Sequence, residues 1–356
     1  MVKVEFMFAR NLTFLFVVSI AAQLQGQKSD FKPITFDSAN DLKVTADLYM
    51  AHDNTAPFIV LCHQAGWSRG EYREIAPKLN KLGFNCMAID QRSGGGVNDI
   101  KNESMKAAKA KKLGTEFTDA EADMIRALEH ARSSYAQGQV ILWGSSYSAA
   151  LSLRIAGENP ELVDGVMAFA PGEYFERLGQ PKDWISQSAK KIAAPAFITS
   201  AKNEEKNWKA IFESIPGQSK TAFLPKTKGN HGSRALWEKF DDHKSYWAQV
   251  NTFLAPFTKT TQLTNIVGEM KQMETDPTTQ LADHQKRQGS KTTAEYTTGQ
   301  TKLEMLSKEI KACQKDLDTI KKEHDAGASS VDWMQKLKTL ETDLGKTKIQ
   351  LKGGSK

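Results

Sequence analysis

Three short and almost entirely apolar segments restrict the possible folds of this chain more than any other feature of its sequence. They are PFIVLC (residues 57–62), FNCMAI (84–89) and VILW (140–143). Stretches with helical periodicity lie between them, at 71–82 and 118–133, and a further helix is expected from Tyr147. Strands that are apolar on both faces are typical of a parallel sheet that helices cover on both sides. The sequence therefore predicts an α/β fold.

The same pattern continues on either side of these segments. Alternating polar and apolar residues at 42–50 predict a half-exposed strand, and three more strands are expected at 163–170, 194–200 and 221–224. A closing helix is expected at 234–254. Ligands of such sheets bind at the carboxyl ends of the strands, so we expect the chemistry of this chain there.

Composition agrees with one globular domain and appended segments. The chain has 356 residues, of which 40% are hydrophobic and 25% charged, and its 48 Lys and Arg nearly balance its 42 Asp and Glu. This excludes disorder throughout and the concentrated basic surface of a nucleic-acid binder. The three cysteines match no zinc motif. Cys62 and Cys86 are expected to be buried free thiols, or a disulfide if their strands are neighbours, and Cys313 lies far away in the tail.

The amino-terminal segment is interpreted as a signal peptide at 1–26. Lys3 and Arg10 precede an apolar run at 12–22, which is too short to span a bilayer as a helix, and small residues follow. This predicts a secreted or periplasmic protein without a transmembrane span after the signal is removed. The alternative is a buried first helix or an uncleaved anchor.

The carboxyl-terminal hundred residues differ from the rest. A globular domain is expected at 27–257, followed by a polar linker at 258–300 and a helical tail at 301–356. Apolar residues in the tail recur at spacings of three and four, which is typical of a helical hairpin or a coiled coil. The tail is expected to mediate self-association or to bind a protein partner; the alternative is a surface helix pair without such a role.

A candidate nucleophile follows the segment VILW. The residues Gly144-Ser145-Ser146-Tyr147-Ser148 lie between a strand and a helix, the context of a nucleophile elbow of the form G-x-S-x-G. This sharp turn needs small residues two before and two after the nucleophile. Gly144 and Ser148 meet that need around Ser146, whereas a nucleophile at Ser145 would place Trp143 in a small position.

A candidate oxyanion loop follows the segment PFIVLC, in His63-Gln64-Ala65-Gly66. Two backbone N–H groups must point at the oxyanion that forms during acyl transfer. Tyr147, directly after the nucleophile, is expected to supply one. Ala65 is expected to supply the other, with Gln64 as the alternative, and His63 is expected to be structural.

The candidate base is His231, in a Gly-flanked loop after the last expected strand, with His243 as the alternative. The orienting carboxylate should follow the strand at 194–200, and Glu204 is our choice. Glu205 and Glu173 are the alternatives, and Glu173 is also a candidate substrate-binding carboxylate. No metal site or cofactor is implied by these residues.

Together, HQAGWSRGEY, AIDQRSGGG, WGSSYSA, APGEYF and GNHGSRALW resemble the α/β-hydrolase superfamily, in particular its dienelactone-hydrolase-like esterases. The resemblance covers about two-thirds of the chain. It implies an α/β-hydrolase fold with an eight-stranded, mostly parallel sheet flanked by helices. The chain departs from the pattern with a serine in place of the cysteine of dienelactone hydrolase, with Ser148 in place of the second Gly, and with Asn203 near the expected acid.

The resemblance implies hydrolysis of carboxylic ester or related acyl bonds without a metal. Ser146, His231 and Glu204 would form the catalytic triad, and Trp67, Tyr147 and Tyr174 are candidates to line the acyl pocket. A small-molecule or polymeric ester is the expected substrate, because no long cap segment follows Gly172. The alternatives are a serine peptidase of the same fold and a non-catalytic scaffold that acts through its tail.

Overall fold

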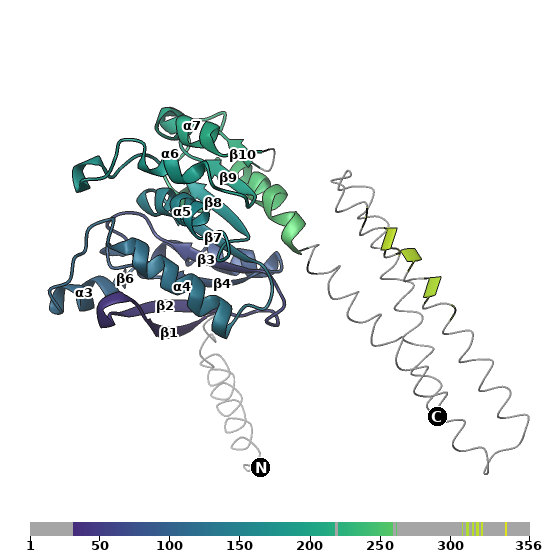
Figure 1. The fold of residues 1–356 in the computed structure, drawn as a ribbon, viewed down its shortest axis with the longest axis horizontal. Helices are drawn as coiled ribbons and strands as arrows, with labels where there is room; N and C mark the ends of the chain where they lie inside the picture. The colour runs from purple at the N-terminus through teal and green to yellow at the C-terminus, as the bar shows by residue number, and fades with distance from the viewer. Residues whose placement is uncertain are drawn as a thin grey trace, which may run out of the picture.

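A computed structural model describes residues 31–217, 220–258 and 261, together with isolated positions between 308 and 339. The expected signal peptide at 1–26 therefore lies outside the described residues. The same holds for Cys313 and, apart from residue 261 and those isolated positions, for the linker after Thr258 and the helical tail. Figure 1 shows the described domain in colour.

The main sheet of residues 31–217 and 220–258 has eight strands, in the order β1-β2-β4-β3-β7-β8-β9-β10. Only the pairs β1–β2 and β2–β4 are antiparallel, and the other five pairs are parallel. This confirms the eight-stranded, mostly parallel sheet. The strands are β1 (Lys32–Asp37), β2 (Lys43–Tyr49), β3 (Phe58–Cys62), β4 (Asn85–Ile89), β7 (Val140–Ser145), β8 (Gly165–Phe169), β9 (Ala196–Thr199) and β10 (Lys220–Phe223).

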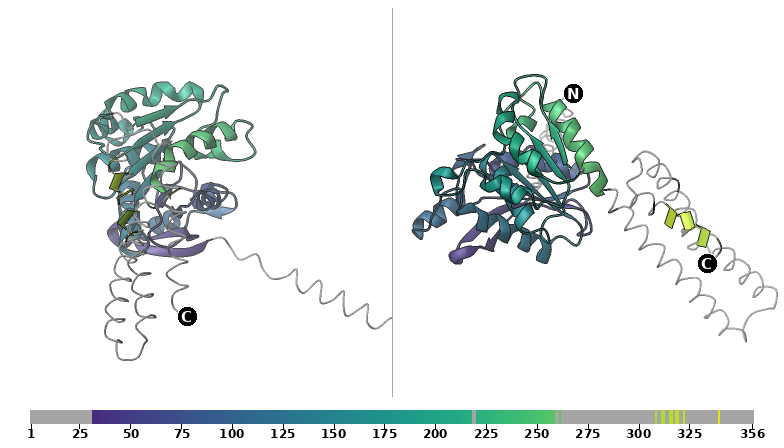
Figure 2. Two further views of the ribbon diagram at one scale, coloured as in Figure 1. Left: turned by 90° about the vertical axis from the view of Figure 1, so that its right-hand side faces the viewer. Right: turned by 45° about the horizontal axis from the view of Figure 1, so that its top comes forward.

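Helices cover both faces of this sheet (Figures 1 and 2). The first face packs against the apolar sides of four helices: α4 (Ala120–Ser134), α5 (Tyr147–Glu158), α6 (Trp184–Ala189) and α7 (Glu205–Ser214). The second face packs against α2 (Ile75–Lys81) and a helix over residues 243–258. The central strands β3, β4, β7 and β8 are fully buried, which explains their uninterrupted apolar sequences.

Several elements differ from the sequence prediction. The helix expected at 71–82 is a 3-10 turn at Arg69–Tyr72 followed by α2, so Glu71 lies on the turn. The closing helix begins near residue 243 and is preceded by a 3-10 turn at Ser233–Leu236, because residues 237–242 form turns. The strand β1, the small hairpin of β5 (Gly96–Val97) and β6 (Ile100–Lys101), and the helix α3 (Glu103–Ala110) complete the domain.

Cys62 and Cys86 are buried free thiols, so the alternative of a disulfide is wrong. Their strands are neighbours, but the register pairs Cys86 with Ile59 and Cys62 with Ile89. The two cysteines are therefore three positions apart, about 10 Å along the strands, which exceeds the reach of a disulfide. They also belong to the cores on opposite faces of the sheet.

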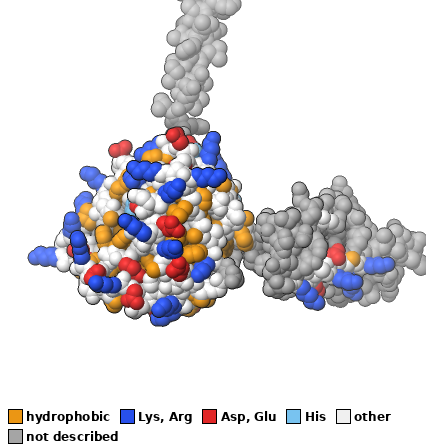
Figure 3. All heavy atoms as spheres, turned by 90° about the horizontal axis from the view of Figure 1, so that it is seen from above, with side chains coloured by type: hydrophobic (Ala, Val, Ile, Leu, Met, Phe, Trp, Pro, Cys, Tyr) orange, Lys and Arg blue, Asp and Glu red, His pale blue; other side chains and the backbone are white. Residues whose placement is uncertain are grey.

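The surface of the described domain carries both signs of charge. Figure 3 shows Lys and Arg side chains interspersed with Asp and Glu over the visible face. No helix among the described residues combines the length and the apolar character needed to cross a membrane.

Candidate active site

Ser146 lies on a strained turn between β7 and α5. Its φ of 59° and ψ of −118° are far from the values that a non-glycine residue prefers, and its backbone N–H donates to the Phe169 carbonyl at 2.7 Å. A Cβ on Gly144 would lie 2.3 Å from the Ser148 carbonyl oxygen, so only glycine fits there. This is the geometry of a nucleophile elbow.

Ser148 replaces the second glycine of the motif without disturbing the turn. Its Oγ is within hydrogen-bonding distance of the Cys62 carbonyl (2.8 Å) and the Ser145 carbonyl (2.9 Å), and it accepts from the Ser145 N–H at 2.9 Å. The small hydroxyl thus ties the turn to the neighbouring strand β3. Serine is tolerated here because its side chain is fully satisfied in the buried space.

His231 pairs with Glu204. The distance from His231 Nδ1 to Glu204 Oε1 is 2.6 Å, and the two side chains are 28% and 20% exposed. Glu204 ends a 3-10 turn after β9, and its second oxygen accepts from the Ala201 N–H at 3.1 Å. The contact through Nδ1 leaves Nε2 as the imidazole nitrogen available to a nucleophile.

The other candidate acids lie elsewhere. Glu205 is exposed at the start of α7. Glu173 accepts from the backbone N–H groups of Ile185 and Ser186, each at 2.9 Å, and from the Ser186 hydroxyl at 2.8 Å, so it anchors the start of α6. His243, the alternative base, lies at the start of the helix over 243–258. The structure therefore brings Glu204, and neither alternative acid, into contact with His231.

The His231 loop is tied to the serine turn. The Ser233 N–H donates to Ser145 Oγ at 2.9 Å, and a Cβ on Gly232 would lie 2.5 Å from the same oxygen. The described residues include no hydrogen bond between the Ser146 hydroxyl and His231. Such bonds are often long before the substrate binds.

The oxyanion loop after β3 offers the Ala65 N–H. The Gln64 N–H, the alternative donor, is already used, because it donates to Glu71 Oε2 at 2.8 Å. Tyr147 is the first residue of α5, where backbone N–H groups have no partner within the helix. Ala65 and Tyr147 both line one cavity with Ser146.

His63 is structural, as expected. It is fully buried, its Nδ1 lies 2.9 Å from the Gln64 carbonyl, and its Nε2 lies 3.1 Å from Asn102 Nδ2. An amide N–H can only donate, so Nε2 accepts and Nδ1 carries the proton. Burial also lowers the pKa of His63 to about 4, which keeps the ring neutral.

The cavity beside Ser146 has a volume of about 610 Å³. Its walls come from the oxyanion loop, the serine turn and two loops before α4 and α6. The lining residues are Ala65, Glu116, Phe117, Ser146, Tyr147, Glu173, Tyr174, Glu176, Arg177 and Leu178.

Two of the expected pocket residues line this cavity, and one does not. The Tyr147 ring stacks on Phe117 at 4.4 Å, and the Tyr174 hydroxyl donates to the Ala170 carbonyl at 2.8 Å. Trp67 instead stacks on Trp237 at 5.3 Å and is absent from the cavity lining. The sequence prediction missed the wall around Phe117, because no periodicity marks that loop.

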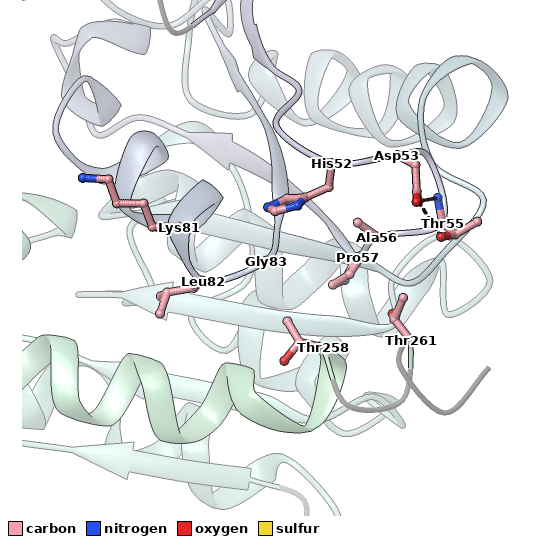
Figure 4. Close-up of a pocket in the computed structure, with 10 residues that line it drawn as sticks. All are labelled: His52, Asp53, Thr55, Ala56, Pro57, Lys81, Leu82, Gly83, Thr258 and Thr261. Carbon is pink, nitrogen blue, oxygen red and sulfur yellow. Dashed lines mark hydrogen bonds between the residues drawn. The ribbon is translucent and has the colours of Figure 1, made fainter. Parts of the chain in front are cut away.

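A second cavity, of about 380 Å³, lies at the opposite ends of the strands (Figure 4). His52 and Asp53 follow β2, Pro57 precedes β3, and Gly83 precedes β4. The dashed lines in Figure 4 mark Asp53 accepting from the N–H and hydroxyl of Thr55. The cavity therefore lies at the amino ends of β3 and β4, away from the serine turn at the carboxyl end of β7.

Comparisons with known proteins agree with this architecture. Two solved structures with a similar fold are an esterase from Pyrococcus furiosus and a dienelactone hydrolase from Anabaena variabilis. The first is 16% identical with a TM-score of 0.50 and covers 64% of this chain and 93% of its own. The second is 14% identical with a TM-score of 0.50 and covers 64% of this chain and 99% of its own. At these identities the similarity establishes the fold.

The sequence comparison assigns the family. None of the curated proteins compared with the chain matches it significantly. A family model described as serine aminopeptidase, S33, matches residues 53–258, which is more than half of the chain. The chain is therefore a hydrolase of the α/β-hydrolase superfamily, and it belongs to the serine aminopeptidase S33 family.

Proposed function

We propose that this hydrolase is an exported serine esterase that cleaves carboxylic ester bonds through an acyl-enzyme intermediate on Ser146. The proposal rests on one observation. His231, paired with Glu204 at 2.6 Å, lies in a loop that hydrogen-bonds to Ser145, directly before the strained serine. A nucleophile, an acid and a base in this chain order, at the carboxyl ends of parallel strands, is the arrangement that acyl transfer on this fold requires.

The reaction proceeds in two steps. His231 takes the proton of Ser146 as Oγ attacks the acyl carbon, and Glu204 orients the imidazole and stabilises its cation. The N–H groups of Ala65 and Tyr147 bind the oxyanion, and the loss of one such donor typically raises the barrier by about 2.7–4 kcal/mol. His231 then protonates the departing alcohol and activates water, which releases the acid and regenerates Ser146.

The cavity limits the acyl group. Its apolar wall is formed by Phe117 stacked on Tyr147, and by Tyr174 and Leu178. A flat or branched apolar acyl group fits against these rings. The carboxylates of Glu116 and Glu176 at the cavity disfavour an acyl chain that ends in a second carboxylate.

A second candidate is hydrolysis of an aminoacyl bond. It is favoured by the family description and by the three glutamates that line the cavity, since carboxylates can bind the ammonium group at a peptide amino terminus. Two of them already have partners. Glu173 anchors α6, and Glu176 lies 3.6 Å from Lys182. For this reason the ester is our first choice.

A substrate panel tests both candidates. The full chain and Ser146→Ala are assayed with p-nitrophenyl acetate, p-nitrophenyl benzoate and alanine p-nitroanilide, after circular dichroism has shown that both proteins are folded. We expect turnover of the esters to exceed that of the anilide, and Ser146→Ala to lose on the order of 10⁴-fold or more in kcat. Full turnover by Ser146→Ala would refute the serine mechanism. Faster cleavage of the anilide would favour the aminopeptidase.

Fluorophosphonate labelling separates an enzyme from a scaffold. Labelling of the wild type, and none of Ser146→Ala, is the expected result. The absence of labelling in a folded wild type would favour the non-catalytic scaffold that acts through its tail.

Export of the chain and self-association through its tail are proposed from the sequence. We expect the full chain, expressed in a bacterial host, to be recovered from the periplasm or the medium with its amino terminus between residues 21 and 27. Recovery from the cytosol with Met1 in place would contradict export. Comparing the hydrodynamic mass of the full chain with that of a chain ending at residue 258 tests self-association through 301–356.

A further inference from the structure

Glu71 is a buried carboxyl group that the proposed mechanism does not use. It is 0% exposed and lies on the 3-10 turn between the oxyanion loop and α2. Three donors point at its side chain: the Gln64 N–H at 2.8 Å, the Gln64 side-chain amide at 3.0 Å and the Ser145 hydroxyl at 2.8 Å. Among the described residues no Lys or Arg forms an ion pair with it. Burying a carboxyl group without a cationic partner costs free energy of folding, so we expect Glu71 to have a role that offsets this cost.

These hydrogen bonds link the three loops of the candidate site. Gln64 precedes Ala65 in the oxyanion loop, and Ser145 precedes Ser146. The Ser145 oxygen also accepts from the Ser233 N–H at 2.9 Å, two residues after His231. A single carboxyl group thus connects the segments that would supply the oxyanion donor, the nucleophile and the base.

The donors around Glu71 favour an ionised carboxylate. All three groups donate, and a carboxylate only accepts, so every bond is satisfied. A protonated carboxyl, or a glutamine, would either place its own O–H or N–H against the Gln64 N–H or make the Ser145 hydroxyl accept where it now donates. Burial raises the pKa of Glu71 to about 7, while the bonds from Gln64 and Ser145 act in the opposite direction.

The charged and titratable groups facing Glu71 are few. His231 lies within electrostatic range across the site, and its positive form favours the ionised carboxylate. Tyr72, the next residue on the turn, donates its hydroxyl to the Cys62 carbonyl at 2.6 Å, and burial keeps it neutral by raising its pKa. The negative charge of Glu71 is thus close enough to favour the imidazole in its positive form, which arises during the reaction.

We propose that Glu71 is a positioning residue of the hydrolytic reaction. Its carboxylate holds the oxyanion loop and the serine turn in register with the His231 loop, and its negative charge stabilises His231 while this imidazole carries the proton of Ser146. This rests on the proposed serine mechanism. It adds a second carboxylate, besides Glu204, that must be ionised for full activity.

The test compares Glu71→Gln, Ser145→Ala and the control Glu74→Gln in the full chain. Glu71→Gln removes the charge at nearly constant shape. Ser145→Ala removes the link to the His231 loop and keeps the charge of Glu71. It therefore still tests the proposal if Glu71→Gln folds poorly. Glu74 is exposed and accepts from the Glu238 N–H at 3.1 Å, so its variant changes a nearby carboxylate outside the site.

The measured quantities are kcat, KM and the pH dependence of kcat/KM with p-nitrophenyl acetate. We expect Glu71→Gln to lower kcat at least about tenfold with KM within about twofold, because the groups are displaced and the imidazolium loses a stabilising charge. Because Glu71 must be ionised for full activity, its titration contributes to the acid limb of log kcat/KM in the wild type. Glu71→Gln should remove this contribution and make the acid limb less steep, and Ser145→Ala should retain it. Glu74→Gln should match the wild type.

Two results would overturn the proposal. One is a Glu71→Gln variant with kcat within about twofold of the wild type. The other is a lowered kcat with an unchanged acid limb, which a purely structural role would produce. Full activity of Ser146→Ala would instead refute the serine mechanism itself, whatever the Glu71 variants do, so the two failures are distinguishable.

Discussion

Replacing Glu71 with glutamine should change how the stability of the protein depends on pH. The pKa of this carboxyl group is raised from its ordinary value of 4.5 to about 7, mainly by burial. The folded chain therefore holds the Glu71 proton more tightly than the unfolded chain does. The contribution of this proton to the free energy of unfolding is fully present below pH 4.5, and it is lost as the pH rises through about 7.

The size of the effect follows from the shift in pKa. A rise from 4.5 to about 7 corresponds to about 3 kcal/mol in the free energy of unfolding. That is a large fraction of the free energy of unfolding of a typical domain, which is about 5–15 kcal/mol. Glutamine does not titrate, so the free energy of unfolding of a Glu71→Gln variant lacks this dependence on pH.

Urea unfolding at several pH values between about 4.5 and 8 measures the effect. The informative quantity is the free energy of unfolding of Glu71→Gln minus that of the wild type, because the subtraction cancels most other titrating groups. We expect this difference to rise by about 3 kcal/mol from the lowest to the highest pH. A constant offset from the altered hydrogen bonds with Gln64 does not affect that slope.

Glu74→Gln is the matched control, and its difference from the wild type should stay flat. A Glu71→Gln difference that changes by less than about 0.5 kcal/mol over this range would refute the reasoning. It would mean that the hydrogen bonds offset burial completely, so that Glu71 ionises as readily in the folded as in the unfolded chain.

Three further substitutions test the site and its support. Gly144→Ala should lower the free energy of unfolding by about 2–3 kcal/mol in thermal or urea unfolding, because its Cβ would lie 2.3 Å from the Ser148 carbonyl oxygen; a stability equal to wild type would contradict the close approach. Glu204→Gln should lower kcat about 10²–10⁴-fold, whereas Glu173→Gln should lower the melting temperature with kcat within about threefold, and the reverse outcome would assign the acid to Glu173. Phe117→Ala should lower kcat/KM several-fold for p-nitrophenyl benzoate and less for the acetate, and an equal loss for both esters would argue against its place in the acyl wall.

The sequence was most informative where local sterics and burial decide the structure. Fully buried strands such as β3 and β7 must be apolar on both faces, so their positions could be predicted closely. The serine turn tolerates only small residues around Ser146, which is why its position could be predicted from the sequence.

Features that depend on contacts between distant segments could not be predicted in the same way. The sequence predicts Glu71 as the first residue of a helix at 71–82, and only the fold places it beside Gln64 and Ser145. The choice between Glu204 and Glu173 depended on which loop reaches His231. The disulfide alternative failed because strand register, which the sequence does not state, separates Cys62 from Cys86.

The order of the strands determines when activity can arise during folding. The serine turn follows the central strand β7, but the candidate base follows β10, the last strand at the edge of the sheet. From Ala65 to His231, the site is assembled from segments that meet only when the sheet is nearly complete. Such long-range contacts form late in folding, and a chain that has not yet emerged to residue 231 lacks the base altogether. An incomplete chain would therefore be enzymatically inactive, and hydrolysis would begin only after the whole domain has folded.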